Sequence, residues 1–218
     1  ALVPTNLVNK NYKKAYKVNV IGTNNLINSL KKKENKPKWL FFSSTSHVYK
    51  PLDKFKKISE KSKLNPASKY GKTKILAEKL LLKKLKKYPI KVCIGRIFSF
   101  TDKKQKEPFV IPSIKKKLNN SKKRIIFKNI NHFRDFLNTD DIISAIYILM
   151  KTSRVGIYNI GSGKKFDLRK IVKLFNRNNK NIVFKNTKRP TYLISNNNKL
   201  LKTKWRPSKF KDNTKYFY

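Results

Sequence analysis

Cysteine is nearly absent from this chain of 218 residues, which contains only Cys93. A single cysteine excludes an intramolecular disulfide and any metal site built from several cysteines. Long apolar runs are also missing, so we expect no membrane-spanning segment. The first ten residues have neither the charged region nor the long apolar region of a signal peptide. Together these absences favour a cytoplasmic protein with no membrane partner and no metal site.

Acidic residues are scarce as well, with 11 Asp and Glu against 55 Lys and Arg, and the formal net charge is +44. Such an excess is typical of proteins that bind nucleic acid. Here, however, the basic residues are spread from Lys10 to Lys215 and form no stripe or tail. Lys, Asn, Ile and Phe are also the residues that A/T-rich codons specify. We therefore interpret the charge as a compositional bias, which predicts nonspecific binding of polyanions at low salt but no specific nucleic-acid partner.

Glycine is limited to six positions, and none of them forms the glycine-rich turn of a dinucleotide-binding site. The segment Gly-Ser-Gly at 161–163 is too short to hold a phosphate group by itself. We expect it to be a turn before a helix.

Strand and helix patterns alternate in the first half of the chain. Apolar periodicity predicts helices over 12–33 and 68–87, and compact apolar runs predict strands over 39–44 and 90–100. This alternation indicates a parallel α/β sheet with right-handed crossovers.

The second half has shorter elements and fits a smaller lobe at the carboxyl ends of the main strands. Three helices and three strands are predicted there. The helices are 109–118, 139–150 with Thr139 or Asp140 as N-cap, and 167–175 with Asp167 as N-cap, and the strands are 124–127, 156–160 and 181–185.

Tyr70 and Lys74 lie four residues apart in the segment SKYGKTK, so a helix places them on one face, one turn apart. A lysine ammonium near a phenol favours the phenolate, and we therefore expect the pKa of Tyr70 to fall from about 10 toward neutral pH. Such a group can donate or accept the proton of an alcohol–ketone interconversion. Thr45, in the hydroxyl-rich segment FFSSTSHVY, is the expected hydroxyl partner. The alternatives are an ordinary helix-face aromatic for Tyr70 and a turn-capping hydroxyl for Thr45.

Taken in order, several segments resemble the extended short-chain dehydrogenase/reductase family, and within it the NAD-dependent epimerases, dehydratases and reductases that act on nucleotide sugars. These segments are VNVIGTNNLINSL, FFSSTSHVY, NPASKYGKTKILAEKLL, the strand end at Arg96, RDFLNTDD, GIYNIGSG and NKLLKTKWRP. The resemblance covers nearly the whole chain, and the order of the segments makes it specific.

The resemblance implies roles for four residues and NAD or NADP as the cofactor. Thr45 matches the residue that hydrogen-bonds the reacting sugar oxygen, Tyr70 the acid/base, and Lys74 the lysine that tunes it and holds the nicotinamide ribose. Asn19 matches an asparagine that supports the cofactor site, although a plain position on the helix surface is the alternative. Hydride would move between a sugar carbon and the nicotinamide while Tyr70 transfers the hydroxyl proton.

The expected substrate contacts are Thr45, Ser46, His47, Ser99 and Arg134. Arg134 matches an arginine that binds the diphosphate or ribose of the nucleotide sugar, which suits its planar fork, and a surface ion pair is the alternative. Ser99 stands where relatives have an asparagine that contacts the diphosphate. Ser46 and His47 replace the Asp-Glu pair of the dehydratases, which argues against a 4,6-dehydratase. His47 could serve as a second acid/base, or it could be a loop histidine without a catalytic role.

The family opens with a strand, a glycine-rich turn and a helix that together bind the cofactor pyrophosphate, and this sequence has no counterpart. We therefore expect an N-terminally truncated Rossmann-like, doubly wound α/β fold. Residues 1–106 would form the remaining part of the dinucleotide-binding domain. Residues 107–218 would mainly form the substrate-binding lobe, with segments that return to the main domain. Relatives often dimerise through the helices that carry VNVIGTNNLINSL and the Tyr-Lys pair, so we expect a homodimer.

Two functions remain open at this point. The first is an NAD(P)-dependent nucleotide-sugar epimerase or 4-keto-sugar reductase. The second is a non-catalytic truncated remnant or a basic module that binds polyanions, in which case binding would fall steeply with ionic strength and would not depend on Tyr70.

Overall fold

A three-stranded parallel sheet lies at the centre of the computed structural model, which describes residues 1–3, 5–34, 36–119, 123–208 and 217. Its strands, in the order β1-β2-β7, are β1 (Trp39–Thr45), β2 (Lys91–Ile97) and β7 (Gly156–Ile160). Each strand is parallel to its neighbour, which confirms the parallel sheet predicted from the alternation of strands and helices. Among the described residues β1 pairs with β2 alone, so its other edge carries no strand.

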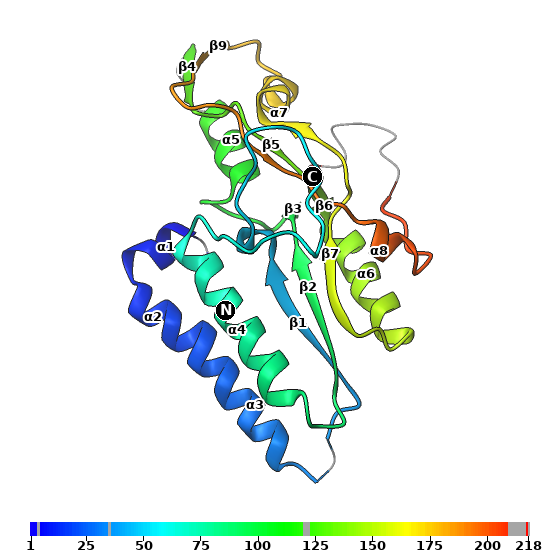
Figure 1. Ribbon diagram of the computed structural model, residues 1–218. Coiled ribbons are helices and arrows are strands. Elements are labelled where there is room, and N and C mark those ends of the chain that lie inside the picture. The colour runs from blue at the N-terminus through cyan, green and yellow to red at the C-terminus, as the bar shows by residue number, and fades with distance from the viewer. Residues whose placement is uncertain (4, 35, 120–122, 209–216, 218) are drawn as a thin grey trace.

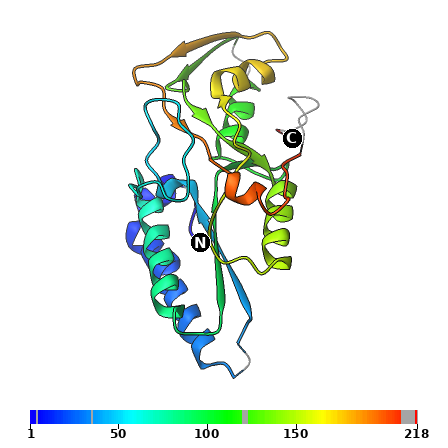
Figure 2. The same cartoon turned by 45° about the vertical axis from the view of Figure 1, so that its right-hand side comes forward.

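Helices cover both faces of this sheet (Figures 1 and 2). On one face α3 (Gly22–Lys32) and α4 (Lys69–Leu85) pack against β2 through an apolar cluster that includes Ile27, Leu81 and Ile94. On the other face α6 (Thr139–Lys151) packs against β2 and β7, and the short α8 (Asn198–Leu201) lies against β7. Apolar side chains at helical spacing form both interfaces, as expected for a doubly wound sheet.

The helix predicted over 12–33 is continuous but not uniform. It consists of α2 (Tyr12–Tyr16), a π-helical turn (Lys17–Ile21) and α3, and it is preceded by α1 (Thr5–Lys10), which the sequence pattern did not predict. The wider π-helical turn carries Asn19, which it places inside the protein.

The remaining elements lie beyond the carboxyl ends of the main strands, in the upper part of Figure 1. The helices there are α5 (Val110–Leu118) and α7 (Leu168–Phe175). The strands are β3 (Ser99–Thr101), β4 (Arg124–Lys128), β5 (Phe133–Arg134), β6 (Phe136–Asn138), β8 (Phe166–Asp167), β9 (Asn181–Lys185) and β10 (Tyr192–Leu193). The two helices, β4 and β6 surround a second apolar core that includes Ile114, Phe127, Phe136, Ile171 and Phe175.

Two helix caps were predicted from single residues. Asp167 caps α7 by accepting a hydrogen bond from the backbone of Arg169, which confirms the prediction. The cap of α6 is Asn138, whose side chain accepts from the backbone N–H of Asp141, so the prediction of Thr139 or Asp140 was wrong by one residue.

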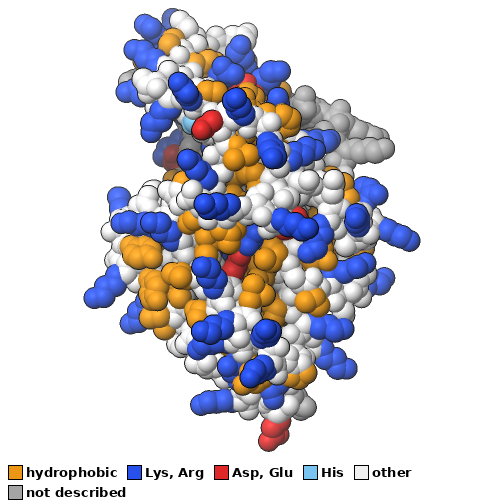
Figure 3. Space-filling model, in the orientation of Figure 1, with side chains coloured by type: hydrophobic (Ala, Val, Ile, Leu, Met, Phe, Trp, Pro, Cys, Tyr) orange, Lys and Arg blue, Asp and Glu red, His pale blue; other side chains and the backbone are white. Residues whose placement is uncertain are grey.

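Lysine and arginine side chains are spread over the whole face seen in Figure 3. Hydrophobic side chains gather on that face over the region that α2, α3 and α4 occupy in Figure 1. Within the described ranges, no helix is long and apolar enough to cross a membrane.

Candidate active site

The carboxyl end of β1 presents Thr45 at the start of a short 3₁₀ turn (Ser46–Val48). The Thr45 hydroxyl accepts a hydrogen bond from the backbone N–H of His47 at 3.3 Å, so it caps this turn. The Thr45 side chain also lies close enough to Tyr70 to lower the pKa of its phenol. The turn-capping alternative is therefore observed, and the pairing of Thr45 with Tyr70 in catalysis stays a prediction.

Helix α4 brings Tyr70 to this turn. Ser68 caps the helix by accepting from the backbone N–H of Gly71 at 3.1 Å, and Tyr70 lies buried in the first helical turn. A Cβ atom on Gly71 would lie 2.1 Å from the carbonyl oxygen of His47. The helix can approach the turn this closely only because residue 71 has no side chain.

Burial raises the pKa of Tyr70, and the neighbouring Thr45 hydroxyl opposes that rise. Lys74 is not among the groups that shift it, so the expected lowering of the Tyr70 pKa by Lys74 is not seen. The physical reason is that desolvation of the phenolate dominates. Tyr70 is therefore a neutral phenol at pH 7, which is the proton-donating form.

Lys74 lies one turn further along α4 and is only 5% exposed. Its ammonium lies 4.4 Å from the centre of the Phe42 ring. Burial lowers the pKa of Lys74 to about 8, and the negative charge of Glu78 acts in the opposite direction. Among the described residues no side chain or carbonyl accepts a hydrogen bond from this ammonium, so it can hold an added hydroxyl group.

Asn19 is 3% exposed, so the helix-surface alternative is wrong. Its amide binds both backbone groups of Leu2, accepting from the N–H at 2.6 Å and donating to the carbonyl at 3.2 Å. It also donates to the hydroxyl of Thr73 at 3.1 Å, and Thr73 in turn bonds the Tyr70 carbonyl. Asn19 therefore braces the helical turn between Tyr70 and Lys74.

Arg134, at the end of β5, donates to the backbone carbonyls of Phe133 and Thr191 at 2.7 and 2.9 Å and to the Thr191 hydroxyl. No carboxylate within the described ranges forms an ion pair with it, so the surface ion pair is not observed. Burial lowers the pKa of Arg134 to about 10. A desolvated guanidinium without a counter-ion is suited to bind an anion.

His47 lies next to Tyr70. Its ring centre lies 5.9 Å from that of Tyr70, edge to face. Part of the side chain reaches solvent, but enough protein surrounds the ring for burial to lower the pKa of His47, and the positive Arg134 lowers it further. His47 is therefore a neutral imidazole at pH 7.

The other two expected substrate contacts lie at carboxyl ends of the central strands. Ser46 is buried in the 3₁₀ turn after β1, and Ser99 is half-buried at the start of β3, just beyond β2. No hydrogen bond of this structure assigns either side chain a role, and their contact with substrate stays a prediction.

Two buried acids of the site region were not among the predicted residues. Glu78 on α4 forms an ion pair with Arg96 on β2 at 2.7 Å. Asp135 accepts from the backbone of Ser162 and Gly163 at 2.7 and 3.0 Å, and burial raises its pKa. In the Gly-Ser-Gly turn, the N–H groups of Ser162 and Gly163 therefore bind the buried Asp135 carboxylate, as expected of a structural turn. Because acidic residues are scarce in this sequence, Glu78 and Asp135 could have been singled out on that ground alone.

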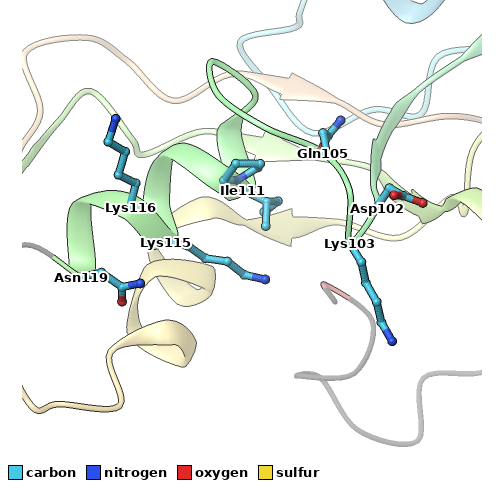
Figure 4. Close-up of a pocket in the computed structure, with 8 residues that line it drawn as sticks. Asp102, Lys103, Gln105, Ile111, Lys115, Lys116 and Asn119 are labelled. Carbon is cyan, nitrogen blue, oxygen red and sulfur yellow. The ribbon is translucent and has the colours of Figure 1, made fainter.

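A pocket of about 370 Å³ lies away from these residues (Figure 4). It is lined by Asp102, Lys103, Gln105, Ile111, Pro112, Lys115, Lys116 and Asn119. None of the predicted site residues lines it, so the candidate site rests on the geometry around Tyr70. In the part of the chain that is described, no group of three His, Cys, Asp or Glu side chains could hold a metal ion.

Comparison with known proteins identifies relatives along nearly the whole chain. A family model described as GDP-mannose 4,6 dehydratase matches residues 8–216. The GDP-6-deoxy-D-mannose reductase of Pseudomonas aeruginosa is 28% identical over 163 residues, which cover 72% of this chain and 54% of the relative. The dTDP-D-glucose 4,6-dehydratase of Dictyostelium discoideum is 32% identical over 155 residues, 66% of this chain and 35% of the relative. Others are UDP-glucose 4-epimerases.

Among solved structures, RMD from Pseudomonas aeruginosa complexed with NADPH superposes with a TM-score of 0.85 at 22% identity, covering 95% of this chain and 74% of that one. This likeness confirms the Rossmann-type α/β fold. The chain spans about half the length, or less, of the first relatives it matches. Since the family model matches almost every residue, the chain belongs to the GDP-mannose 4,6 dehydratase family, within the extended short-chain dehydrogenases/reductases that modify nucleotide sugars.

Proposed function

We propose that this chain carries the catalytic side chains of an NAD- or NADP-dependent enzyme that transfers hydride at a carbon of a nucleotide sugar, as an epimerase or a 4-keto-sugar reductase. One observation carries the proposal. Tyr70 is a buried phenol beside Thr45, with Lys74 one helical turn away.

The chain's own residues fit the proton-transfer half of this reaction. Thr45 holds the sugar oxygen, and the neutral phenol of Tyr70 donates its proton to a keto oxygen or takes it back from a hydroxyl. A bound nicotinamide supplies or receives the hydride. The Lys74 ammonium, nearly buried and without an acceptor, is suited to bind a ribose hydroxyl of that cofactor.

Arg134 is the proposed anchor for the nucleotide. Its guanidinium is desolvated and has no counter-ion, and a diphosphate would supply two negative charges within reach of its planar fork. His47 lies next to Tyr70 and feels the charge of Arg134, and we expect it to face the sugar. We propose that its neutral imidazole accepts a hydrogen bond from a sugar hydroxyl and can serve as a second base.

A reductase or epimerase is favoured over a dehydratase by Ser46 and His47. Loss of water needs one group that protonates the leaving hydroxyl and another that removes a proton from the neighbouring carbon. Ser46 is a buried hydroxyl and His47 is neutral, so neither supplies the acid that an Asp–Glu pair would. One relative is a GDP-6-deoxy-D-mannose reductase, so net reduction is the first activity to test.

We also propose a homodimer in the cytoplasm. Helices α2 to α4 and the π-helical turn leave large apolar side chains in solvent, including Val18, Ile21, Leu26 and Leu76. Such a surface is stabilised when a second copy covers it. The one cysteine, Cys93, is free and buried, which suits a reducing compartment.

The test of catalysis uses the protein made together with whatever coding sequence directly precedes Ala1. A 4-keto nucleotide sugar is added, and oxidation of NADPH or NADH is followed by absorbance. Tyr70→Phe is expected to lower turnover by about 10²- to 10⁴-fold, the usual contribution of a general acid, with little change in nucleotide-sugar binding. Normal turnover by this variant would contradict the mechanism.

A second measurement separates this function from nonspecific binding of polyanions. Binding of GDP and UDP to the chain is measured by calorimetry for Arg134→Gln and for the exposed control Arg124→Gln. The proposal expects a loss of binding for Arg134→Gln only. Equal small losses for both variants, with binding that vanishes at high salt, would favour the polyanion-binding module.

A further inference from the structure

Helix α4 aligns three ionisable side chains, Tyr70, Lys74 and Glu78, at intervals of four residues. Residues at this spacing lie on one face, one turn apart. All three are buried, and Glu78 is the least exposed of them at 2%. The acid therefore lies directly behind the lysine, on the side away from the phenol.

Residues from two strands hold the Glu78 carboxylate. Arg96 on β2 donates to it from Nη2 at 2.7 Å and from Nε at 3.1 Å, a bidentate contact. The Ser44 hydroxyl on β1 donates to the same carboxylate. The third guanidinium nitrogen, Nη1, donates to the Tyr49 hydroxyl at 2.8 Å. Because both oxygens are bound by groups on the sheet, the carboxylate is held in place one helical turn from Lys74.

Within the described ranges, Lys74 has no comparable partner. Its ammonium lies over the Phe42 ring, and Glu78 is the one carboxylate whose charge acts on it. Arg96 is a second buried cation on the other side of Glu78. Removal of the carboxylate charge would leave two buried cations without a counter-ion, and the cation that can lose a proton is Lys74.

We propose that Glu78 is a positioning residue that keeps Lys74 protonated and fixes the α4 turn that carries it, through its contacts to Arg96 and Ser44. The link of this role to catalysis rests on the function proposed above. The effect of Glu78 on the charge of Lys74 needs neither cofactor nor substrate. This role would explain why an ion pair between Glu78 and Arg96 joins α4 to the central sheet.

The experiment measures the protonation of Lys74 directly. The chain is labelled with acetic anhydride over a range of pH, and the modification of Lys74 is read by peptide mass spectrometry. In the unchanged chain the midpoint is expected near the Lys74 pKa of about 8. Glu78→Gln keeps the shape and removes the charge, and it should lower the midpoint by about one to three pH units, the usual effect of one nearby charge.

Two controls separate charge from structure. Ser44→Ala removes a hydrogen bond from the same carboxylate and leaves its charge, so the midpoint should stay near its original value. Glu78→Asp keeps the charge, and should keep most of the effect. A folded Glu78→Gln chain with an unchanged midpoint would overturn the proposal.

Glu78→Gln leaves Arg96 unpaired, and the variant could fail to fold for that reason. Circular dichroism would reveal this, as would a Lys74 midpoint near the unfolded value of about 10.4. The double variant Glu78→Gln with Arg96→Gln then replaces both charges by amides. Its midpoint should again fall below the original one, and a midpoint equal to the original would overturn the proposal. Because labelling needs neither cofactor nor substrate, an inactive enzyme with the expected midpoints would count against the proposed function only.

Discussion

Replacing Lys74 by methionine should stabilise the fold while it removes the group that we propose binds the ribose. The pKa of Lys74 falls from 10.5 in a free side chain to about 8 in the structure. At roughly 1.36 kcal/mol for each pKa unit, burial of the ammonium costs about 3 kcal/mol at pH 7. This figure already contains the favourable effect of Glu78. Methionine has a similar length and no charge, and Glu78 keeps Arg96 as its partner, so most of that cost should be recovered.

The effect should depend on pH with a definite sign. A lysine whose pKa is lower in the folded state destabilises the fold fully below about pH 8, and the effect is lost by about pH 10.5, where both states are neutral. The gap in unfolding free energy between Lys74→Met and the unchanged chain should therefore shrink from about 3 kcal/mol at pH 7 to less than about 1 kcal/mol at pH 10.

Urea-induced unfolding followed by circular dichroism at pH 7, 8.5 and 10 measures this gap. Lys72→Met is the matched control, because Lys72 lies on the same helix and is exposed. Its stability should differ from that of the unchanged chain by a few tenths of a kcal/mol at every pH. The reasoning would be refuted if Lys74→Met were no more stable than this control at pH 7, or if its advantage did not change with pH.

Three further predictions follow from other contacts. Gly71→Ala places a Cβ against the His47 carbonyl, so thermal melts should show a loss of about 1–3 kcal/mol, and a stable variant would mean that α4 does not need this approach. Asn19→Leu removes the three hydrogen bonds that include both backbone groups of Leu2, and should cost about 1–3 kcal/mol in the same assay, with unchanged stability as the contrary result. The net charge of +44 predicts a melting temperature that rises between 20 mM and 300 mM sodium chloride, since salt screens self-repulsion; a flat response would show that the spread charges do not repel measurably.

Periodicity was sufficient for the main helices and strands because their apolar faces are long and their ends carry strong signals. At the starts of α4 and α7 a single residue of a cap-forming type precedes the helix, Ser68 and Asp167 respectively, and each one caps its helix. At α6 three consecutive residues could cap the helix, and only tertiary structure selects Asn138. The π-helical turn was not predictable, because one extra residue in a helical turn leaves the apolar pattern almost unchanged.

The sequence was sufficient to predict that Tyr70 and Lys74 share a helix face, but not to predict how their surroundings shift the pKa of each group. The spacing in SKYGKTK placed Tyr70 and Lys74 on one face. It could not show that burial of the phenol outweighs the lysine, since desolvation depends on atoms from distant segments. For the same reason the pair Glu78–Arg96, on a helix and a strand, left no local signal beyond two charged residues in apolar surroundings.

The open edge of β1 has a consequence for the behaviour of the isolated chain. The strand reads WLFFSST, without a charge or a proline, and its backbone groups on one side face no other strand among the described residues. Natural proteins protect such edges, because a bare apolar strand pairs readily with the same strand of another molecule. The high positive charge opposes this at low salt. Concentrated salt would remove that opposition, so aggregation of this chain should begin at β1, through backbone pairing and before any global unfolding.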